Sequence, residues 1–168
     1  MKKRLIFTMA LALLLVATLA LPVIAATEQE VPASVTVSQF MSITITDAGT
    51  AGINFGSLST GTSNNPDTDA NDTTPSITVG VDTGSVNVDL KIKGTDFVSG
   101  GNSFGVANGK YSLTYAGAKV ALSTTYATFA TDVPATGAAT LWHWLDVPVS
   151  GVAAGAYSSN FSYQAVAH

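Results

Sequence analysis

The chain has 168 residues, with seven Lys and Arg against eleven Asp and Glu, and no cysteine. Three of the basic residues lie at positions 2–4, so four lysines and no arginine accompany all eleven acidic residues in the rest of the chain. Such a composition repels phosphate backbones and lacks the guanidinium fork used in phosphate recognition. We therefore expect no nucleic-acid partner, and stability must come from burial and hydrogen bonding rather than disulfides.

The first 25 residues have the composition of a secretory signal peptide. Basic residues at positions 2–4 precede an apolar run over residues 5–21, and Pro22 ends any helix there. Small residues at Ala25 and Ala26 then supply a cleavage site, after Ala25 or alternatively after Ala26. We expect the rest of the chain to be secreted to the cell surface and to meet a membrane only during export. An uncleaved anchor is the other interpretation, because the run approaches the length of a membrane span.

The remaining sequence predicts an all-β protein with a single β-sandwich over residues 38–168, of jelly-roll or Greek-key type. Apolar residues alternate with Ser, Thr or charged residues, and Gly, Pro and Asn clusters separate the alternating runs. Asn108-Gly109 predicts a tight hairpin turn, because both residues tolerate positive φ. The expected strands cover residues 31–46 with a break at Gln39-Phe40, 53–58, 77–81, 86–92, 111–115, 120–122, 141–149 and 157–166.

The segment at residues 26–37 is a candidate donor strand. A polar leader precedes a stretch in which apolar and small polar residues alternate. A strand at a free terminus can complete the sheet of a neighbouring subunit, with main-chain hydrogen bonds giving affinity and alternate side chains filling pockets. Because such a contact is head to tail, it propagates into a filament. The inserted residues would be Val31, Ala33, Val35 and Val37; alternatively, this stretch is the first strand of its own sandwich.

An acidic loop is the strongest polar cluster in the sequence. Asp67, Asp69, Asn71 and Asp72 offer the hard oxygens that calcium prefers. The loop begins like an EF-hand, but Asp72 stands where the EF-hand has glycine and Thr78 where it has glutamate, so it is not one. The alternatives are a calcium site and a solvated acidic loop, and no other cofactor is expected.

Two segments match the N-glycosylation pattern, at Asn71-Asp72-Thr73 and at Asn160-Phe161-Ser162. The pattern is short and often unused. Asn71, in the predicted loop, is the better candidate of the two.

No enzyme is expected from this sequence. The chain has only His143 and His168, no cysteine, and no nucleophile, metalloprotease, phosphate-binding or dinucleotide-binding motif. His168 is the last residue, and His143 is interpreted as a packed or half-exposed strand residue. We therefore name no catalytic residue.

Aromatic residues concentrate near the end of the chain. Trp142 and Trp144 on an exposed face would stack on sugar rings, as in a carbohydrate-binding module. The favoured alternative is that they fill the sandwich core with Tyr157, Phe161 and Tyr163, because aromatic side chains bury large apolar areas.

Two stretches resemble known fibre subunits. Ile53-Asn54-Phe55-Gly56-Ser57-Leu58, after Val-rich strands, and the closing stretch from Trp144 to Ala165 are similar in layout to archaeal bundling pilins and TasA-type biofilm-matrix proteins. The resemblance implies a jelly-roll subunit joined to further copies of itself by an N-terminal donor strand, here within residues 26–37. The sequence lacks the long charged insertion that would mark the TasA branch.

The favoured function is thus a structural subunit of an extracellular filament or biofilm matrix. Its partners would be copies of the same chain, with other surface proteins or polysaccharide as further partners. The alternative is a monomeric secreted surface or carbohydrate-binding domain. A groove missing one strand would favour the first, and exposed tryptophans on a flat face would favour the second.

Overall fold

The computed structural model describes Ser34 and residues 41–49 and 52–168. The compact unit to which almost all of them belong spans Ser38–His168. The expected signal peptide, its cleavage positions, and the donor residues Val31, Ala33, Val35 and Val37 lie outside the described residues. Across the described ranges, no helix has the length and apolar character needed to cross a membrane.

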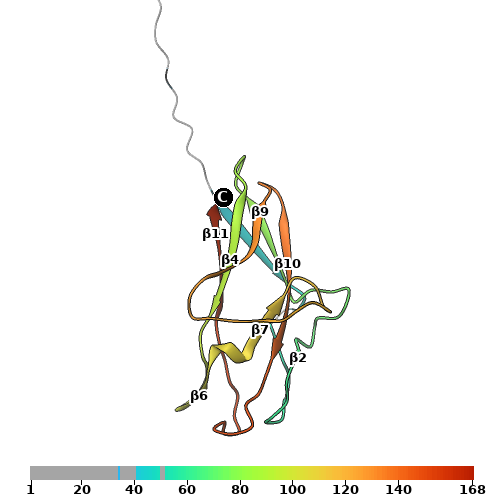
Figure 1. The fold of residues 1–168 in the computed structure, drawn as a ribbon, viewed down its shortest axis with the longest axis vertical. Coiled ribbons are helices and arrows are strands. Elements are labelled where there is room, and N and C mark those ends of the chain that lie inside the picture. Colours follow the sequence, from blue (N-terminus) through green and yellow to red (C-terminus); the bar gives the residue numbers. More distant parts are fainter. Residues whose placement is uncertain (1–33, 35–40, 50–51) are drawn as a thin grey trace, which may run out of the picture. The chain divides into compact units, whose positions relative to one another are not determined.

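Two antiparallel sheets and a small hairpin form the fold (Figure 1). The larger sheet has the order β1 (Ser42–Asp47), β3 (Ile77–Asp82), β10 (Ala138–Leu145), β7 (Gly109–Ser112) and β8 (Val120–Ala121), with β2 (Asn65–Pro66) also beside β10. The second sheet has the order β11 (Phe161–Ala167), β4 (Val88–Gly94) and β9 (Ala127–Val133). The hairpin consists of β5 (Phe97–Ser99) and β6 (Asn102–Phe104), and one 3-10 turn, η1, spans Val106–Asn108.

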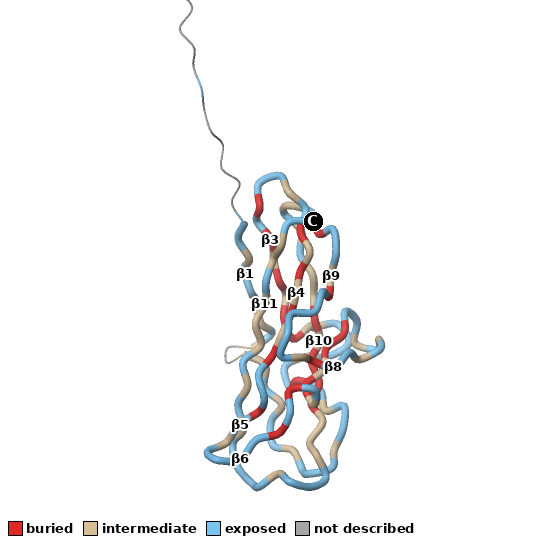
Figure 2. The backbone as a smooth tube through the Cα atoms, turned by 60° about the vertical axis from the view of Figure 1, so that its left-hand side comes forward, coloured by how far each residue is buried: buried red, intermediate tan, exposed pale blue. Residues whose placement is uncertain are grey.

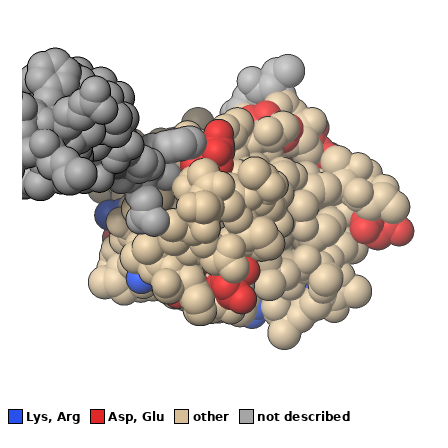
Figure 3. Space-filling model, turned by 90° about the horizontal axis from the view of Figure 1, so that it is seen from above, with Lys and Arg blue, Asp and Glu red and all other residues tan. Residues whose placement is uncertain are grey.

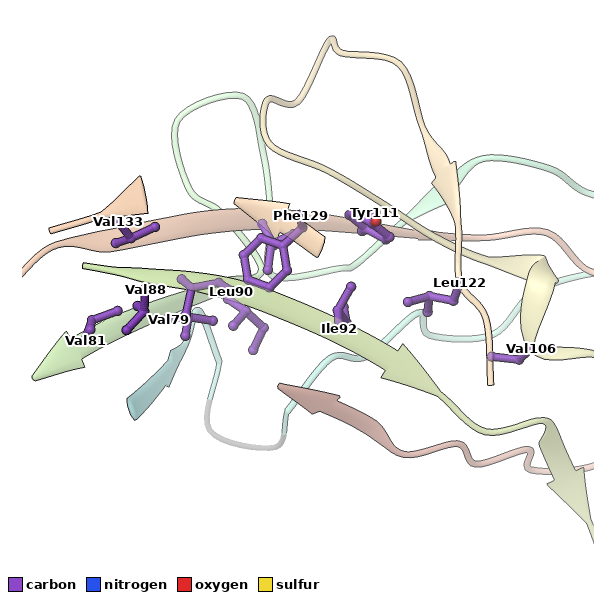
Figure 4. Packing of buried hydrophobic residues seen from close by; sticks show 12 residues of the cluster. Val79, Val81, Val88, Leu90, Ile92, Val106, Tyr111, Leu122, Phe129 and Val133 are labelled. Carbon is purple, nitrogen blue, oxygen red and sulfur yellow. The ribbon is translucent and has the colours of Figure 1, made fainter. Parts of the chain in front are cut away.

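The core lies between the two sheets and follows from period-2 patterning. Alternate residues of β3 and β4 point inward, so that Val79, Val88 and Leu90 have no exposed surface. Side chains from β7, β9 and β10 complete this core (Figure 4). Each fully buried aliphatic side chain contributes about 1.5–3 kcal/mol relative to an exposed one. The prediction of an all-β sandwich is confirmed.

Strand registers define two ends of this unit. β1 starts and β3 ends at one end, where β4 begins and β11 finishes; we call this the turn end. The backbone N–H of His168 donates to the carbonyl of Asn87 there, at 3.0 Å. The opposite end, with the β5–β6 hairpin, is called the groove end for the feature described below (Figures 1 and 2). Acidic side chains on the face in Figure 3 are scattered rather than gathered into one patch.

The expected strands at 77–81 and 86–92 correspond closely to β3 and β4, and those at 111–115, 120–122, 141–149 and 157–166 overlap β7, β8, β10 and β11. Two further expectations were wrong. Residues 53–58 form no strand, because the backbone of Asn54 bonds instead to the loop at Asp67 and Thr68. Asn108-Gly109 is not a hairpin turn: Asn108 ends η1, and Gly109 is extended at φ −76° and opens β7. β9 was not expected at all.

Candidate functional site

The most prominent concave feature is a groove of about 790 Å³ between the edge strands β1 and β11. Within the part of the chain that the structure describes, β1 pairs only with β3 and β11 only with β4, so each has an edge without a strand partner. The walls continue beyond these strands into the segments 52–60 and 152–160. Unpaired sheet edges are templates for the addition of another strand.

Ile45 shows that the interior of the sandwich is uncovered at this groove. It lies two residues from Ile43, on the same face of β1, and Ile43 packs against the core. Ile45 nevertheless remains 48% exposed and lines the groove. An inward-facing isoleucine left half exposed indicates that the described residues do not cover it.

The floor of the groove is an aromatic cluster formed by Phe97, Phe104, Tyr157 and Phe161. Phe97 and Phe104 face each other across the β5–β6 hairpin with ring centroids 4.8 Å apart, and Phe104 lies 5.0 Å from Tyr157. The Phe161 ring meets Phe97 edge-on at 6.1 Å. Such pairs add about 0.5–1.5 kcal/mol each beyond their buried area.

Gly94 makes room for this arrangement. It pairs with Phe161 across β4 and β11, and an added Cβ would lie 2.8 Å from Val106 and 3.3 Å from the Phe161 ring. A side chain at this position would therefore displace Val106 and press against the Phe161 ring, which forms part of the groove floor.

His143 lies directly behind the groove wall. Its ring is 1% exposed, stacks on Phe161 at 5.4 Å, and places Nε2 3.3 Å from the hydroxyl of Tyr163, which also lines the groove. Nδ1 is buried and has no hydrogen-bond partner among the described residues. Burial lowers the pKa of His143 to about 3, because the charged imidazolium loses its hydration. The residue is therefore a neutral core histidine at physiological pH, the packed one of the two arrangements that the sequence left open.

The contrast between Ile43 and Ile45 leads to a stability prediction. In dilute solution, Ile43→Thr is expected to lower the free energy of unfolding by about 1–2 kcal/mol, because it places a hydroxyl in the core. Ile45→Thr, two residues away on the same face, should change it by less than about 0.5 kcal/mol. Urea titration of both variants measures the difference, and equal losses would mean that Ile45 is covered in the single chain.

No protein-family model, curated protein or solved structure matches this chain. The interpretation of the site thus rests on its own geometry.

The two tryptophans do not form an exposed platform. Leu141, His143 and Leu145 occupy the inner face of β10, so Trp142 and Trp144 point to its other face. Trp144 is 3% exposed, with Tyr115 at 5.9 Å and the Lys119 Nζ at 4.5 Å from its ring.

Trp142 is half-buried, and its indole N–H donates to the carbonyl of Asn71 at 2.7 Å. The tryptophans are therefore packed beneath loops on the outer side of β10, whereas Phe161 and Tyr163 pack against the core clusters.

The acidic loop is organised by its own hydrogen bonds. Asp67 is 2% exposed, and its Oδ1 accepts from the backbone N–H groups of Asn54 and Asp69 at 3.1 and 3.3 Å. Asn71 Oδ1 accepts from the N–H groups of Thr73 and Thr74. Among the described residues, no group of three or more His, Asp or Glu is placed to hold a metal ion. Asp69 and Asp72 lie in the same loop, and calcium binding there stays a prediction.

The two glycosylation candidates occupy different surroundings. Asn71 is exposed in the acidic loop, with its side-chain oxygen engaged in the turn just described. Asn160 is exposed and lines the groove immediately before β11. A glycan at Asn160 would occupy the groove mouth, so modification there and strand insertion would compete.

Sequence reasoning missed the groove residues Ile45, Phe97 and Phe104. Two patterns would have pointed to them. Ile45 continues the odd-numbered apolar series of β1, and Phe97 and Phe104 stand at equal separations from Gly100-Gly101, as the two ends of a hairpin do. That the three meet at one groove depends on pairings between distant segments, which no local pattern specifies.

Proposed function

We propose that the mature chain, residues 26–168, is a structural subunit of an extracellular filament or matrix. Copies of the chain would join head to tail when the segment 26–37 of one enters the groove of the next. The observation that carries the proposal is the groove with an aromatic floor beside two strand edges that no described strand pairs, with the inward-facing Ile45 left 48% exposed in it. The alternating segment 31–37 has the pattern of a strand able to fill it.

The groove offers a largely uncharged, partly apolar surface to an inserted strand. Among the described residues that line it, Asp47 is the only charged one, and the floor is the aromatic cluster. The inserted face would present Val31, Ala33, Val35 and Val37, which carry no polar side-chain atoms to leave unsatisfied. Secretion by the signal peptide at residues 1–25 belongs to the same proposal, because the subunits must reach the outside before they assemble.

The alternative, a monomeric carbohydrate-binding domain, has less support. Sugar recognition by stacking requires exposed aromatic rings, and Trp144 is covered by Tyr115 and Lys119. One observation does favour ligand binding by a monomer: the groove volume lies within the range of about 300–1,000 Å³ typical of small-ligand sites. A small apolar ligand would then protect the monomer against unfolding without producing filaments.

Electron microscopy of two forms tests the proposal. The mature protein, residues 26–168, and a form beginning at Ser38 are concentrated and imaged under identical conditions. Filaments are expected from the longer form only, because the shorter one keeps the groove but lacks the strand to fill it. Circular dichroism of the shorter form verifies that it is folded. Filaments from both forms, or from neither, would contradict the proposal.

A further inference from the structure

The direction of the inserted strand follows from the two ends of the fold. The chain enters β1 at Ser42, at the turn end, whereas the groove is lined by Ile45 and Asp47 late in β1 and by Phe161 and Tyr163 early in β11. The groove is therefore displaced toward the groove end, away from the point where the preceding segment joins the unit. A segment from the neighbouring subunit would enter the groove at the groove end, with its C-terminal residues nearest to that end.

Two modes of filling the groove have opposite strand directions. A segment supplied by a second copy, as in the proposed function, would run parallel to β1 and antiparallel to β11. A segment of the same chain would have to turn back at residues 38–40 and run antiparallel to β1 and parallel to β11. The direction of the strand thus distinguishes exchange between subunits from closure within one subunit.

The sequence around residues 38–40, where the chain would have to turn back, favours donation of the strand to a second copy. Ser38-Gln39-Phe40-Met41 contains no Gly, Asn, Asp or Pro. Two-residue hairpin turns favour Gly, Asn and Asp, because their central residues have positive φ. A continuous extended passage from residue 37 into β1 needs no such residue. This passage would carry the segment away from its own groove and toward another subunit.

Hydrogen bonding favours β11 as the edge that receives the strand. Every strand pair that the structure describes is antiparallel, and antiparallel ladders are slightly more stable per residue than parallel ones. The wall that continues from β1 is hydrogen-bonded through Asn54 to Asp67 and Thr68, and the wall that continues from β11 is hydrogen-bonded through Ser158 to Val98. Strand direction therefore decides between the two edges. β11 is paired with β4 along its whole length, and Phe161 and Tyr163 at its start line the groove.

We propose that residues 31–37 of a second copy pair antiparallel with β11, extending the sheet β9–β4–β11 by a fourth strand. Resting on the proposed function, this assigns the strand that receives the donor and its direction. Val31, Val35 and the other odd-numbered donor residues face the aromatic cluster and Ile45. Pro32, Ser34 and Thr36 face outward, and residue 31 lies farther along β11 toward the turn end than residue 37.

Paired thiols introduced into the full mature chain test this assignment, because the native chain has no cysteine to react. The donor positions are Pro32 and Ser38, which are about 20 Å apart in an extended strand. The acceptor positions are Gln164 on β11 and Ala154 near the groove end, both exposed. The double variants P32C/Q164C, S38C/A154C, P32C/A154C and S38C/Q164C are treated with a short bismaleimide after assembly, and each sample is imaged for filaments. Single-cysteine variants control for cross-linking between filaments.

P32C/Q164C and S38C/A154C are expected to give ladders of covalent oligomers on a denaturing gel, and the other two pairs at least fivefold less product. Oligomer ladders from the other two pairs instead would overturn the assigned direction. A cross-linked monomer from those pairs would mean that the segment closes on its own subunit. Filaments without cross-links in any pair would reject β11 as the receiving edge while leaving the proposed function standing. If no variant and no unmodified protein forms filaments, the proposed function fails and this inference with it.

Discussion

The folded protein is expected to lose stability as the pH falls from about 6.5 toward 3, because His143 is buried as a neutral imidazole. Burial lowers its pKa in the folded chain to about 3, whereas the unfolded chain binds the proton near 6.5. Between these values the unfolded state holds more protons, so the free energy of unfolding decreases as the pH falls. The slope is about 1.4 kcal/mol per pH unit and the total is of order 5 kcal/mol. Above pH 6.5 this contribution is fully present.

His143→Gln isolates the effect. The Gln amide can hydrogen bond to Tyr163 near the position of Nε2 but does not titrate, so urea titrations of this variant should show a much flatter profile between pH 6.5 and 3.5. His168→Gln is the matched control. The hydrogen bond to Asp89 raises the pKa of His168, and its contribution has the opposite sign, being lost as the pH rises through that pKa. A His143→Gln profile as steep as that of the native protein would refute the assignment to His143.

Val35→Asp is expected to prevent filament formation by the mature chain. In the proposed mode Val35 faces the aromatic floor of the groove, so the variant would bury an unpaired carboxylate there. This costs several kcal/mol, and about 1.4 kcal/mol corresponds to a tenfold change in affinity. We expect the concentration needed for assembly to rise by more than about a hundredfold. Sedimentation followed by electron microscopy measures the polymerised fraction.

Thr36→Asp provides the matched control for this experiment. It introduces the same charge one residue away, but an extended strand places residue 36 on the outward face. Its assembly should resemble that of the native chain. Equal inhibition by the two variants would indicate a general effect of charge on the segment, and normal assembly by Val35→Asp would exclude this residue from the contact.

Much of the sandwich was predictable from the sequence, because its central strands alternate clearly. Ile77, Val79 and Val81 of β3 alternate with Thr78 and Gly80, and the structure buries the first three. β9 lacks such a pattern. Only Phe129 and Val133 of its seven residues are buried, its register against β4 shifts, and Asp132 has φ of 54°. A bulged strand that mixes Ala and Thr with two buried apolar residues has no strict period for sequence analysis to detect.

The groove was less accessible to prediction than the segment proposed to fill it. Residues 31–37 are contiguous, so their alternation can be read directly. The groove brings together β1, β11 and segments from residues 52–60 and 152–160, and its existence depends on the separation of two strand edges. Burial also cannot be read locally: Ile43 and Ile45 have identical side chains in adjacent inward positions, yet only the first packs against the core.

The chain enters β1 at one end of the fold and the groove lies toward the other, and this arrangement determines how a fibre of these subunits would respond to a pulling force. Tension along a fibre linked through these features would pull on Ser42 in one direction and on β11 in the other, roughly along the strands. The six residue pairs between β1 and β3, and the seven between β11 and β4, would then be loaded in shear. In shear the hydrogen bonds of a ladder share the force and must break together, whereas a perpendicular pull would unzip them one at a time. A subunit without disulfides would thereby resist extension through the direction of its strands.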